Sequence, residues 1–228
     1  MTTFIIGASR GIGLELAKQY AAAGEAVIAG ARNPDSAEPL QALAQSESLI
    51  EVEQIDLSDF PSIDACAERL SGQALHNVIV CAGETGGAKQ GIDDVDIEAW
   101  HRTLDTNTIG PLLAARAFKP HMEAAGEAKL MLLTSQLAAS TWPFGGMLIY
   151  STTKAAMSKV GQILALDWKE APISVGLMHP GWVQTDMGGP QADITAEESA
   201  AGIRDVINSM TKSDSGKFYK WNGDIHPW

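Results

Sequence analysis

The chain has 228 residues, of which 45% are hydrophobic and 19% are charged, and its net charge is −12 at pH 7. A chain of this length and composition is typical of a globular protein with a sizeable core. The acidity argues against nucleic acid as a partner, because phosphate backbones bind concentrated Lys and Arg. Cys66 and Cys81 form no CxxC motif or Cys/His cluster, so we expect neither a metal site nor a disulfide.

The sequence also bears on location. No secretion signal precedes the first apolar run, and no apolar run reaches the roughly 18 residues of a membrane span. We therefore expect a cytoplasmic protein with no membrane partner.

Short apolar runs alternate along the chain with longer segments of helical period. The expected strands are 2–7, 25–31, 48–55, 76–82, 128–135, 173–179 and 216–221. The expected helices are 11–24, 36–46, 62–72, 97–126, 148–169 and 197–210. Pro111 and Pro120 should kink or break the fourth of these helices, because proline removes a hydrogen bond from the helix interior.

This alternation of strands and helices predicts the fold. Several of the strands are apolar at consecutive positions, as strands covered on both faces are. The pattern predicts an α/β protein with one doubly wound parallel sheet, a Rossmann fold of about seven strands with helices on both faces. No linker or repeat interrupts it, so we expect residues 1–228 to form a single domain.

A glycine-rich turn follows the first expected strand and opens the first expected helix. Its sequence is Gly7-Ala8-Ser9-Arg10-Gly11-Ile12-Gly13. Glycines let the backbone approach a ligand closely, and a helix N-terminus attracts phosphate. In the first strand–helix–strand unit this turn predicts a dinucleotide site, and the alternative is a purely structural turn.

The second expected strand ends at the position that selects between the two nicotinamide cofactors. NAD enzymes carry an acidic residue there to bind the ribose 2′-hydroxyl, whereas this chain has Ala31 followed by Arg32. Arg10 lies in the glycine turn, and two guanidiniums match the charge and geometry of a 2′-phosphate. The sequence therefore favours NADP(H), and the alternative for both arginines is an ordinary solvent-exposed charge.

Tyr150 and Lys154 form a YxxxK motif inside an expected helix, where a spacing of four places both side chains on one face. A nearby cation lowers the pKa of a phenol, so Tyr150 can serve as a catalytic acid and base. Ser135 ends the fifth expected strand, at the edge where open α/β sheets bind ligands. Asn107 is locally unfavourable in mid-helix, which indicates a functional role. The alternative is a packed tyrosine beside a solvated lysine.

These motifs, in this order along essentially the whole chain, resemble the short-chain dehydrogenase/reductase family. The passages His179–Pro190 and His226–Trp228 resemble its small carbonyl reductases of the C-factor and sniffer branch. The sequence departs from the family pattern at Ile6, where a Thr is usual, and at Cys81, where an Asn is usual.

The resemblance implies roles for individual residues. Ser135 polarises the substrate carbonyl, Tyr150 supplies the proton, and Lys154 with Asn107 and a bound water resupplies it. Asp56 binds the adenine amino group, and Thr185 binds the nicotinamide carboxamide. The full set of implied cofactor contacts is Gly7, Ser9, Arg10, Gly11, Ile12, Gly13, Arg32, Asp56, Leu57, Ala82, Gly83, Asn107, Tyr150, Lys154, Pro180, Gly181, Val183 and Thr185.

The expected substrate pocket is apolar and carries no Arg or Lys. Its residues are Gln136, Leu137, Trp142, Phe144, Met147, Trp182 and Met187. Such a lining favours an aromatic or aliphatic ketone or aldehyde over a sugar phosphate, although some of these residues could belong to the core. By analogy with the family we expect a homodimer or homotetramer, formed through the helices that carry Asn107 and Tyr150.

Two other functions fit parts of the sequence. One is a regulator that senses NADP(H) without turnover; such proteins usually lack the Tyr or the Lys, and both are present here. The other is a signalling protein in which reductase activity is secondary.

Overall fold

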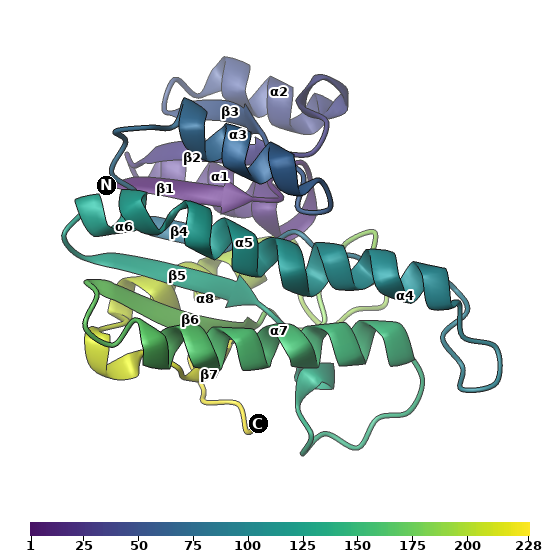
Figure 1. Cartoon of the computed structure of the whole chain (residues 1–228). Helices are drawn as coiled ribbons and strands as arrows, with labels where there is room; N and C mark the ends of the chain where they lie inside the picture. Colours follow the sequence, from purple (N-terminus) through teal and green to yellow (C-terminus); the bar gives the residue numbers. More distant parts are fainter.

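The computed structural model describes all 228 residues and contains one sheet of seven parallel strands (Figure 1). The strand order is β3-β2-β1-β4-β5-β6-β7. The strands are β1 (Thr2–Ile6), β2 (Ala26–Ala31), β3 (Ile50–Gln54), β4 (Asn77–Val80), β5 (Ala128–Leu133), β6 (Ile173–His179) and β7 (Phe218–Lys220). The order reverses between β1 and β4, and open α/β sheets bind ligands at such a switch point. The predicted doubly wound parallel fold is confirmed.

Helices cover both faces of the sheet (Figure 1). One face carries α1 (Gly11–Ala22), α2 (Glu38–Ser46) and α8 (Ala196–Ser209). The other carries α3 (Phe60–Arg69), α4 (Ile97–Leu104), α5 (Gly110–Ala117), α6 (Lys119–Ala124) and α7 (Leu148–Asp167). The short turns are η1 (Pro34–Ser36), η2 (Asp105–Ile109), η3 (Gln136–Ala138) and η4 (Lys212–Asp214). None of the helices combines the length and apolar character needed to cross a membrane.

The core consists of two apolar layers, one on each face of the sheet. Successive side chains of a strand point to opposite faces, so a continuous apolar run serves both layers. In β1, Phe4 and Ile6 pack with Phe118 toward α5, whereas Ile5 packs with Leu16 toward α1. This double burial explains why the strand sequences are apolar without alternation.

The expected helix 97–126 is divided into four segments. Pro111 lies in the first turn of α5 and Pro120 in the first turn of α6, so both interruptions expected at these prolines are confirmed. A π-helical turn, η2, separates α4 from α5. No local sequence pattern predicts this turn, which carries Asn107.

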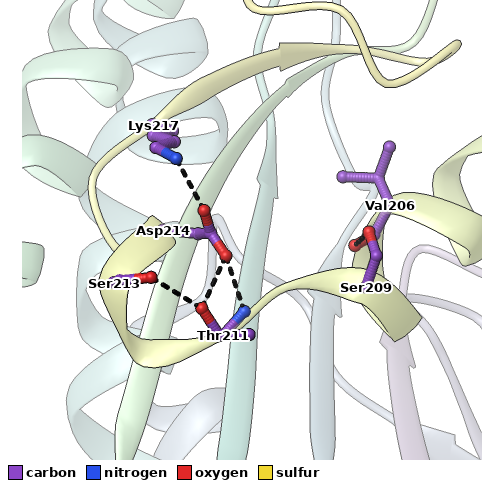
Figure 2. Close-up of polar contacts among 6 residues, drawn as sticks. All are labelled: Val206, Ser209, Thr211, Ser213, Asp214 and Lys217. Atoms are coloured by element: carbon purple, nitrogen blue, oxygen red, sulfur yellow. Dashed lines mark hydrogen bonds and ion pairs between the residues drawn. The ribbon is translucent and has the colours of Figure 1, made fainter.

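Figure 2 shows how the chain turns from α8 into the edge strand β7. The Asp214 carboxylate accepts hydrogen bonds from Thr211 N at 2.9 Å and from Thr211 Oγ1 at 2.7 Å. It also pairs with Lys217 Nζ at 2.6 Å. The bond from Lys217, followed by those from Thr211, lowers the pKa of the Asp214 carboxyl to about 2. The charged carboxylate thus closes η4 and sets the start of β7.

Candidate active site

A cleft of about 570 Å³ lies at the carboxyl ends of the strands, where β1 and β4 diverge. Its lining comes from the turns after β1 to β4, from η2 and from the loop after β6. The lining residues are Gly7, Ser9, Arg10, Gly11, Ile12, Gly13, Arg32, Ile55, Asp56, Leu57, Cys81, Ala82, Gly83, Glu84, Thr106, Gln184, Thr185, Asp186 and Met187. Twelve of the fifteen residues expected to bind the cofactor outside the catalytic group are in this lining.

The glycine turn leaves backbone, rather than side chains, facing the cleft. Gly11 has φ +57°, in the left-handed region that favours glycine. A Cβ on Gly13 would collide with the carbonyl oxygen of Gly7. Gly7 N and Ala8 N each donate to the carbonyl of Gly30 at 2.9 Å, which ties the turn to β2. The turn therefore has the close backbone approach that a dinucleotide site requires.

Arg10 and Arg32 both line the cleft, and both are exposed. Arg10 Nη1 lies 2.8 Å from Asp186 Oδ2, and this ion pair joins the glycine turn to the loop after β6. Asp186 was not among the expected site residues. The two guanidiniums expected to meet one phosphate thus share a cleft, and one of them has a carboxylate partner.

Asp56 and Leu57 lie at the end of β3 and line the cleft, as expected. Asp56 Oδ1 accepts from Ser58 N at 2.9 Å and from Ser58 Oγ at 2.7 Å. These bonds form the local turn into α3. Asp56 therefore has a structural role in addition to its position in the cleft.

Three of the expected cofactor residues lie outside the lining of the cleft. The carbonyl of Pro180 accepts from Ser199 Oγ at 2.6 Å. Gly181 has φ +91°, and a Cβ there would clash with Ile194. The side chain of Val183 is buried. Thr185, four residues after Gly181, does line the cleft and accepts from Gly188 N at 3.2 Å.

Gly83 connects the cleft to the catalytic residues expected from the sequence. A Cβ on Gly83 would stand 3.0 Å from Lys154 Nζ and 3.2 Å from Asn107 Oδ1. Because Gly83 itself lines the cleft, a ligand there has direct access to this cluster. A side chain at 83 would therefore crowd the ammonium and the amide of the site.

Asn107 is fully buried within the π-helical turn η2. Its Oδ1 accepts from Glu84 N at 2.9 Å, and its Nδ2 donates to Glu84 O at 2.9 Å and to Thr153 Oγ1 at 3.1 Å. The amide therefore holds the segment after β4 against α7. π-Helical turns are frequent at functional sites because they redirect a side chain.

Tyr150, Lys154 and Ser135 meet beside Asn107. Lys154 Nζ donates to the carbonyl of Leu133 at 2.8 Å and lies 6.0 Å from the centroid of the Tyr150 ring. Burial lowers the pKa of Lys154 to about 8. Burial also raises the pKa of Tyr150, and a hydrogen bond with Ser135 partly offsets this shift. The sequence had suggested a lowered tyrosine pKa, but the loss of hydration outweighs the stabilisation of the phenolate.

The expected substrate residues lie on two loops, one between Ser135 and Tyr150 and the other after β6. Gln136, Leu137 and Met147 are half-buried, whereas Trp142, Phe144, Trp182 and Met187 are exposed. Only Met187 belongs to the lining of the 570 Å³ cleft. Met147, with φ +49°, is the single non-glycine residue in the left-handed region and directly precedes α7. Such backbone strain is concentrated at functional sites.

Three residues near the cluster were missed by the sequence analysis. Glu84 lines the cleft, and its Oε1 accepts from Thr103 Oγ1 at 3.0 Å. Thr153 lies inside the YxxxK motif and receives the bond from Asn107. Gln90 Oε1 accepts from Tyr150 N at 3.1 Å, which caps the start of α7. The position of Thr153 in the motif was a usable signal, but no local pattern distinguishes Gln90.

The doubly wound sheet, the glycine turn and the cleft at its switch point define a dinucleotide-binding protein of the Rossmann class. The family model of short chain dehydrogenases matches residues 1–195, so the chain belongs to this family.

Individual relatives agree with this assignment. The C-signal protein of Myxococcus xanthus is 33% identical over 155 residues, which are 67% of this chain and 92% of that protein. The carbonyl reductase Sniffer of D. melanogaster has a TM-score of 0.91 at 28% identity, covering 100% of this chain and 99% of its own. A carbonyl reductase from Pseudomonas aeruginosa PAO1 in complex with NADP has a TM-score of 0.89 at 32% identity, with the same coverage. The predicted family and its C-factor and sniffer branch are confirmed.

Proposed function

We propose that this protein is an NADPH-dependent reductase that converts a ketone or aldehyde to an alcohol by hydride transfer. The proposal depends on one observation, the junction at Gly83, where the cleft meets Lys154 Nζ and Asn107 Oδ1. A dinucleotide in this cleft has a phenol, an ammonium and a hydroxyl beside it. The similarity to a carbonyl reductase in complex with NADP supports the same class of reaction.

The residues of the cleft fit NADP(H). A Cβ on Gly13 would clash with the carbonyl of Gly7, and one on Gly83 would crowd Lys154 Nζ and Asn107 Oδ1. Arg10 and Arg32 supply positive charge at the lining, and Ala31 presents no carboxylate to a 2′-phosphate. When bound, the cofactor supplies the hydride, and the protein supplies orientation and the proton.

Tyr150 acts as the proton donor. Reduction requires a phenol that is protonated at neutral pH, and burial raises the pKa of Tyr150 accordingly. Ser135 lies close enough to lower the pKa of Tyr150, which places its hydroxyl to donate to the substrate oxygen as negative charge develops there.

Lys154 and Asn107 support this proton transfer. Lys154, held by the Leu133 carbonyl, provides the positive charge that stabilises the phenolate after the proton has left. Asn107 keeps the Gly83–Glu84 segment against α7, so that Lys154 stays next to the cleft. We further propose that a water bound to Asn107 provides the route by which a proton returns to Tyr150.

We propose a bulky apolar substrate. Trp142 and Phe144 are exposed on the loop between Ser135 and Tyr150, and Trp182 is exposed on the loop after β6. Large exposed aromatic surfaces indicate ligand contact. These side chains carry no charge that would retain a phosphorylated or thioester substrate. An aryl or alkyl ketone or aldehyde satisfies such a lining.

Replacing Tyr150 with Phe tests the mechanism. Tyr150→Phe should lower kcat for NADPH-dependent ketone reduction by roughly 100-fold or more, because the proton donor is lost. NADPH binding, measured by the fluorescence of the bound cofactor, should not change. Tyr20→Phe is the matched control, since the Tyr20 hydroxyl is buried without a partner and Tyr20 does not line the cleft. Full activity in Tyr150→Phe would refute the mechanism.

Replacing Arg32 with Ala tests the cofactor. Arg32→Ala should raise the Kd for NADPH roughly tenfold and leave that for NADH unchanged, because only NADPH carries the 2′-phosphate. Titration of both cofactors measures this difference. Arg102→Ala removes an exposed arginine outside the cleft and should affect neither Kd. An unchanged preference in Arg32→Ala would remove this residue from the site.

A signalling role is the second candidate, and the similarity to C-signal favours it. In that case reductase activity is secondary, and a Tyr150→Phe protein should retain the biological effect. Complementation of a deletion strain with the Tyr150→Phe variant, scored by the biological effect, separates the two functions.

Three further features belong to the proposal. We propose that residues 1–228 act as a single domain in the cytoplasm. We also propose a homodimer or homotetramer, because α5 and α7 share an apolar groove that is open to solvent. The groove residues are Leu112, Arg116, Lys119, Val160, Ile163, Leu164, Asp167 and Trp168.

A further inference from the structure

The segment that follows β7 folds back along this strand. Gly223, with φ +90°, reverses the chain, and Lys220 N donates to the carbonyl of Asp224 at 2.8 Å. Ile225 then bridges Tyr219 in antiparallel fashion, and His226 N donates to the carbonyl of Phe218 at 2.7 Å. Residues 225–228, the return segment, thus run back along β7 and antiparallel to it.

His226 stands at the centre of an aromatic cluster, although it belongs to a short irregular segment. Its ring is 2% exposed. The ring centroid lies 4.6 Å from that of Phe218, 5.8 Å from that of His179 and 6.3 Å from that of Trp142. Burial, with smaller contributions from His226 and Lys220, lowers the pKa of His179 to about 4, so the His179 ring is uncharged at neutral pH.

The return segment is also bonded to the loop that joins the two catalytic elements. The main-chain oxygen of Trp228 accepts from Thr141 N at 3.2 Å and from Ser140 Oγ at 3.4 Å. In Figure 1 the chain ends beside the loop that leads from η3 to α7. This loop begins at Ser135 and ends where α7 presents Tyr150, and it carries the exposed Trp142.

We propose that His226 and Trp228 are positioning residues of the active site, which hold the Ser135–Tyr150 loop and fix Trp142 for binding a bulky carbonyl substrate. The inference rests on the proposed reductase function and deepens it. His179 directly precedes Pro180, so the same cluster joins the substrate loop to the turn after β6.

The loop needs such support for a physical reason. Residues 139–147 contain no helix or strand, and Trp142 is 45% exposed. Ordering a loop on substrate binding costs conformational entropy, and an already ordered loop avoids part of this cost. The aromatic contacts to His226 and the two bonds to Trp228 supply this order before substrate arrives.

The test compares His226→Ala with Ile225→Ala, a control in the same segment whose side chain is 56% exposed and outside the cluster. Hydrogen exchange of the peptide containing Thr141 should be faster in His226→Ala and unchanged in Ile225→Ala. The KM for an aryl ketone should rise roughly threefold to tenfold in His226→Ala, because this is the change in affinity that the loss of one aromatic pair produces. The kcat and the Kd for NADPH should stay close to wild type. His226→Phe, which keeps the aromatic contact, should restore the KM.

Three outcomes decide against the proposal. Unchanged exchange at Thr141 in His226→Ala means that the return segment does not hold the loop. Faster exchange with an unchanged KM means that the position of the loop does not affect substrate binding. A parallel loss of thermal stability, NADPH binding and kcat, without rescue by His226→Phe, reduces His226 to a folding residue. If the wild-type protein reduces no ketone, the proposed function fails, and the exchange result alone then decides whether the segment holds the loop.

Discussion

Tyr150 and Lys154 show opposite pKa shifts with one physical cause. Burial disfavours the charged form of each, which raises the pKa of the phenol and lowers that of the ammonium to about 8. The phenol therefore keeps its proton at neutral pH. Lys154 remains a cation only below about pH 8. Reduction, which needs a protonated phenol beside a charged lysine, is therefore favoured below this pH.

This shift predicts a pH dependence. Lys154 is charged below its pKa and loses its charge as the pH rises through about 8, so kcat for ketone reduction should fall over this interval. A pH–rate profile at saturating NADPH measures the effect. Lys154→Arg should abolish this fall, because a guanidinium stays protonated. Lys159→Ala, an exposed lysine of the same helix, should keep the wild-type profile. A flat wild-type profile well above pH 8 would contradict the assignment.

Residue spacing made part of the site predictable. Tyr150 and Lys154 are four residues apart on one helix, and the glycines of the turn after β1 lie within seven residues. Other contacts join distant parts of the chain: Gln90 meets Tyr150 across 60 residues, and Arg10 meets Asp186 across 176. Such pairs depend on how loops pack, which no local pattern specifies.

At the scale of elements, α7 has an incomplete start. Met147 at its N-cap offers no side-chain hydrogen bond, whereas helix N-termini leave backbone N–H groups to be satisfied. Gln90 supplies both acceptors from another loop, its Oε1 to Tyr150 N at 3.1 Å and its carbonyl to Leu148 N at 3.4 Å. The helix that carries Tyr150 is thus capped by a side chain remote in sequence.

Removing this cap should affect both stability and catalysis. Gln90→Ala should lower the free energy of unfolding by about 1 kcal/mol, the usual cost of a lost cap. The kcat should fall several-fold, because the first turn of α7 positions Tyr150. Gln90→Glu keeps the acceptor and should retain most of the activity, and the exposed Gln191→Ala is the control. Thermal melts and kcat for ketone reduction measure these effects. An unaltered kcat in Gln90→Ala would show that the cap does not position the phenol.

The segment 97–126 shows why element boundaries were only partly predictable. The prolines marked the starts of α5 and α6 because their chemistry is local. The π-helical turn η2 depends instead on tertiary contacts. Thr108 Oγ1 donates to the carbonyl of Thr153 at 2.8 Å, Asn107 bonds to Glu84, and Gly110 packs directly on Leu57. These partners come from three other parts of the chain.

At the scale of the molecule, the two ends of α7 serve different purposes. Its first turns carry Tyr150 and Lys154 beside the cleft. Its last turns line a groove of about 550 Å³ together with α5 and α6. Ile163 in this groove is 46% exposed, and Leu166 on the same helix is 66% exposed. Apolar surface of this kind gains free energy when it is buried against a partner. A second copy of the chain can cover the groove without blocking the cleft.

This separation predicts that assembly can be disrupted without loss of cofactor binding. Ile163→Glu should weaken self-association roughly tenfold or more, because a carboxylate buried at an apolar interface loses its hydration without a partner. Light scattering after gel filtration, over a range of concentrations, measures the change. NADPH affinity should remain at the wild-type value, since Ile163 does not line the cleft. Leu49→Glu, at an exposed leucine that precedes β3 and lies outside the groove, should leave the mass unchanged. A monomeric wild-type protein, or an equal effect of both substitutions, would contradict an interface through α5 and α7.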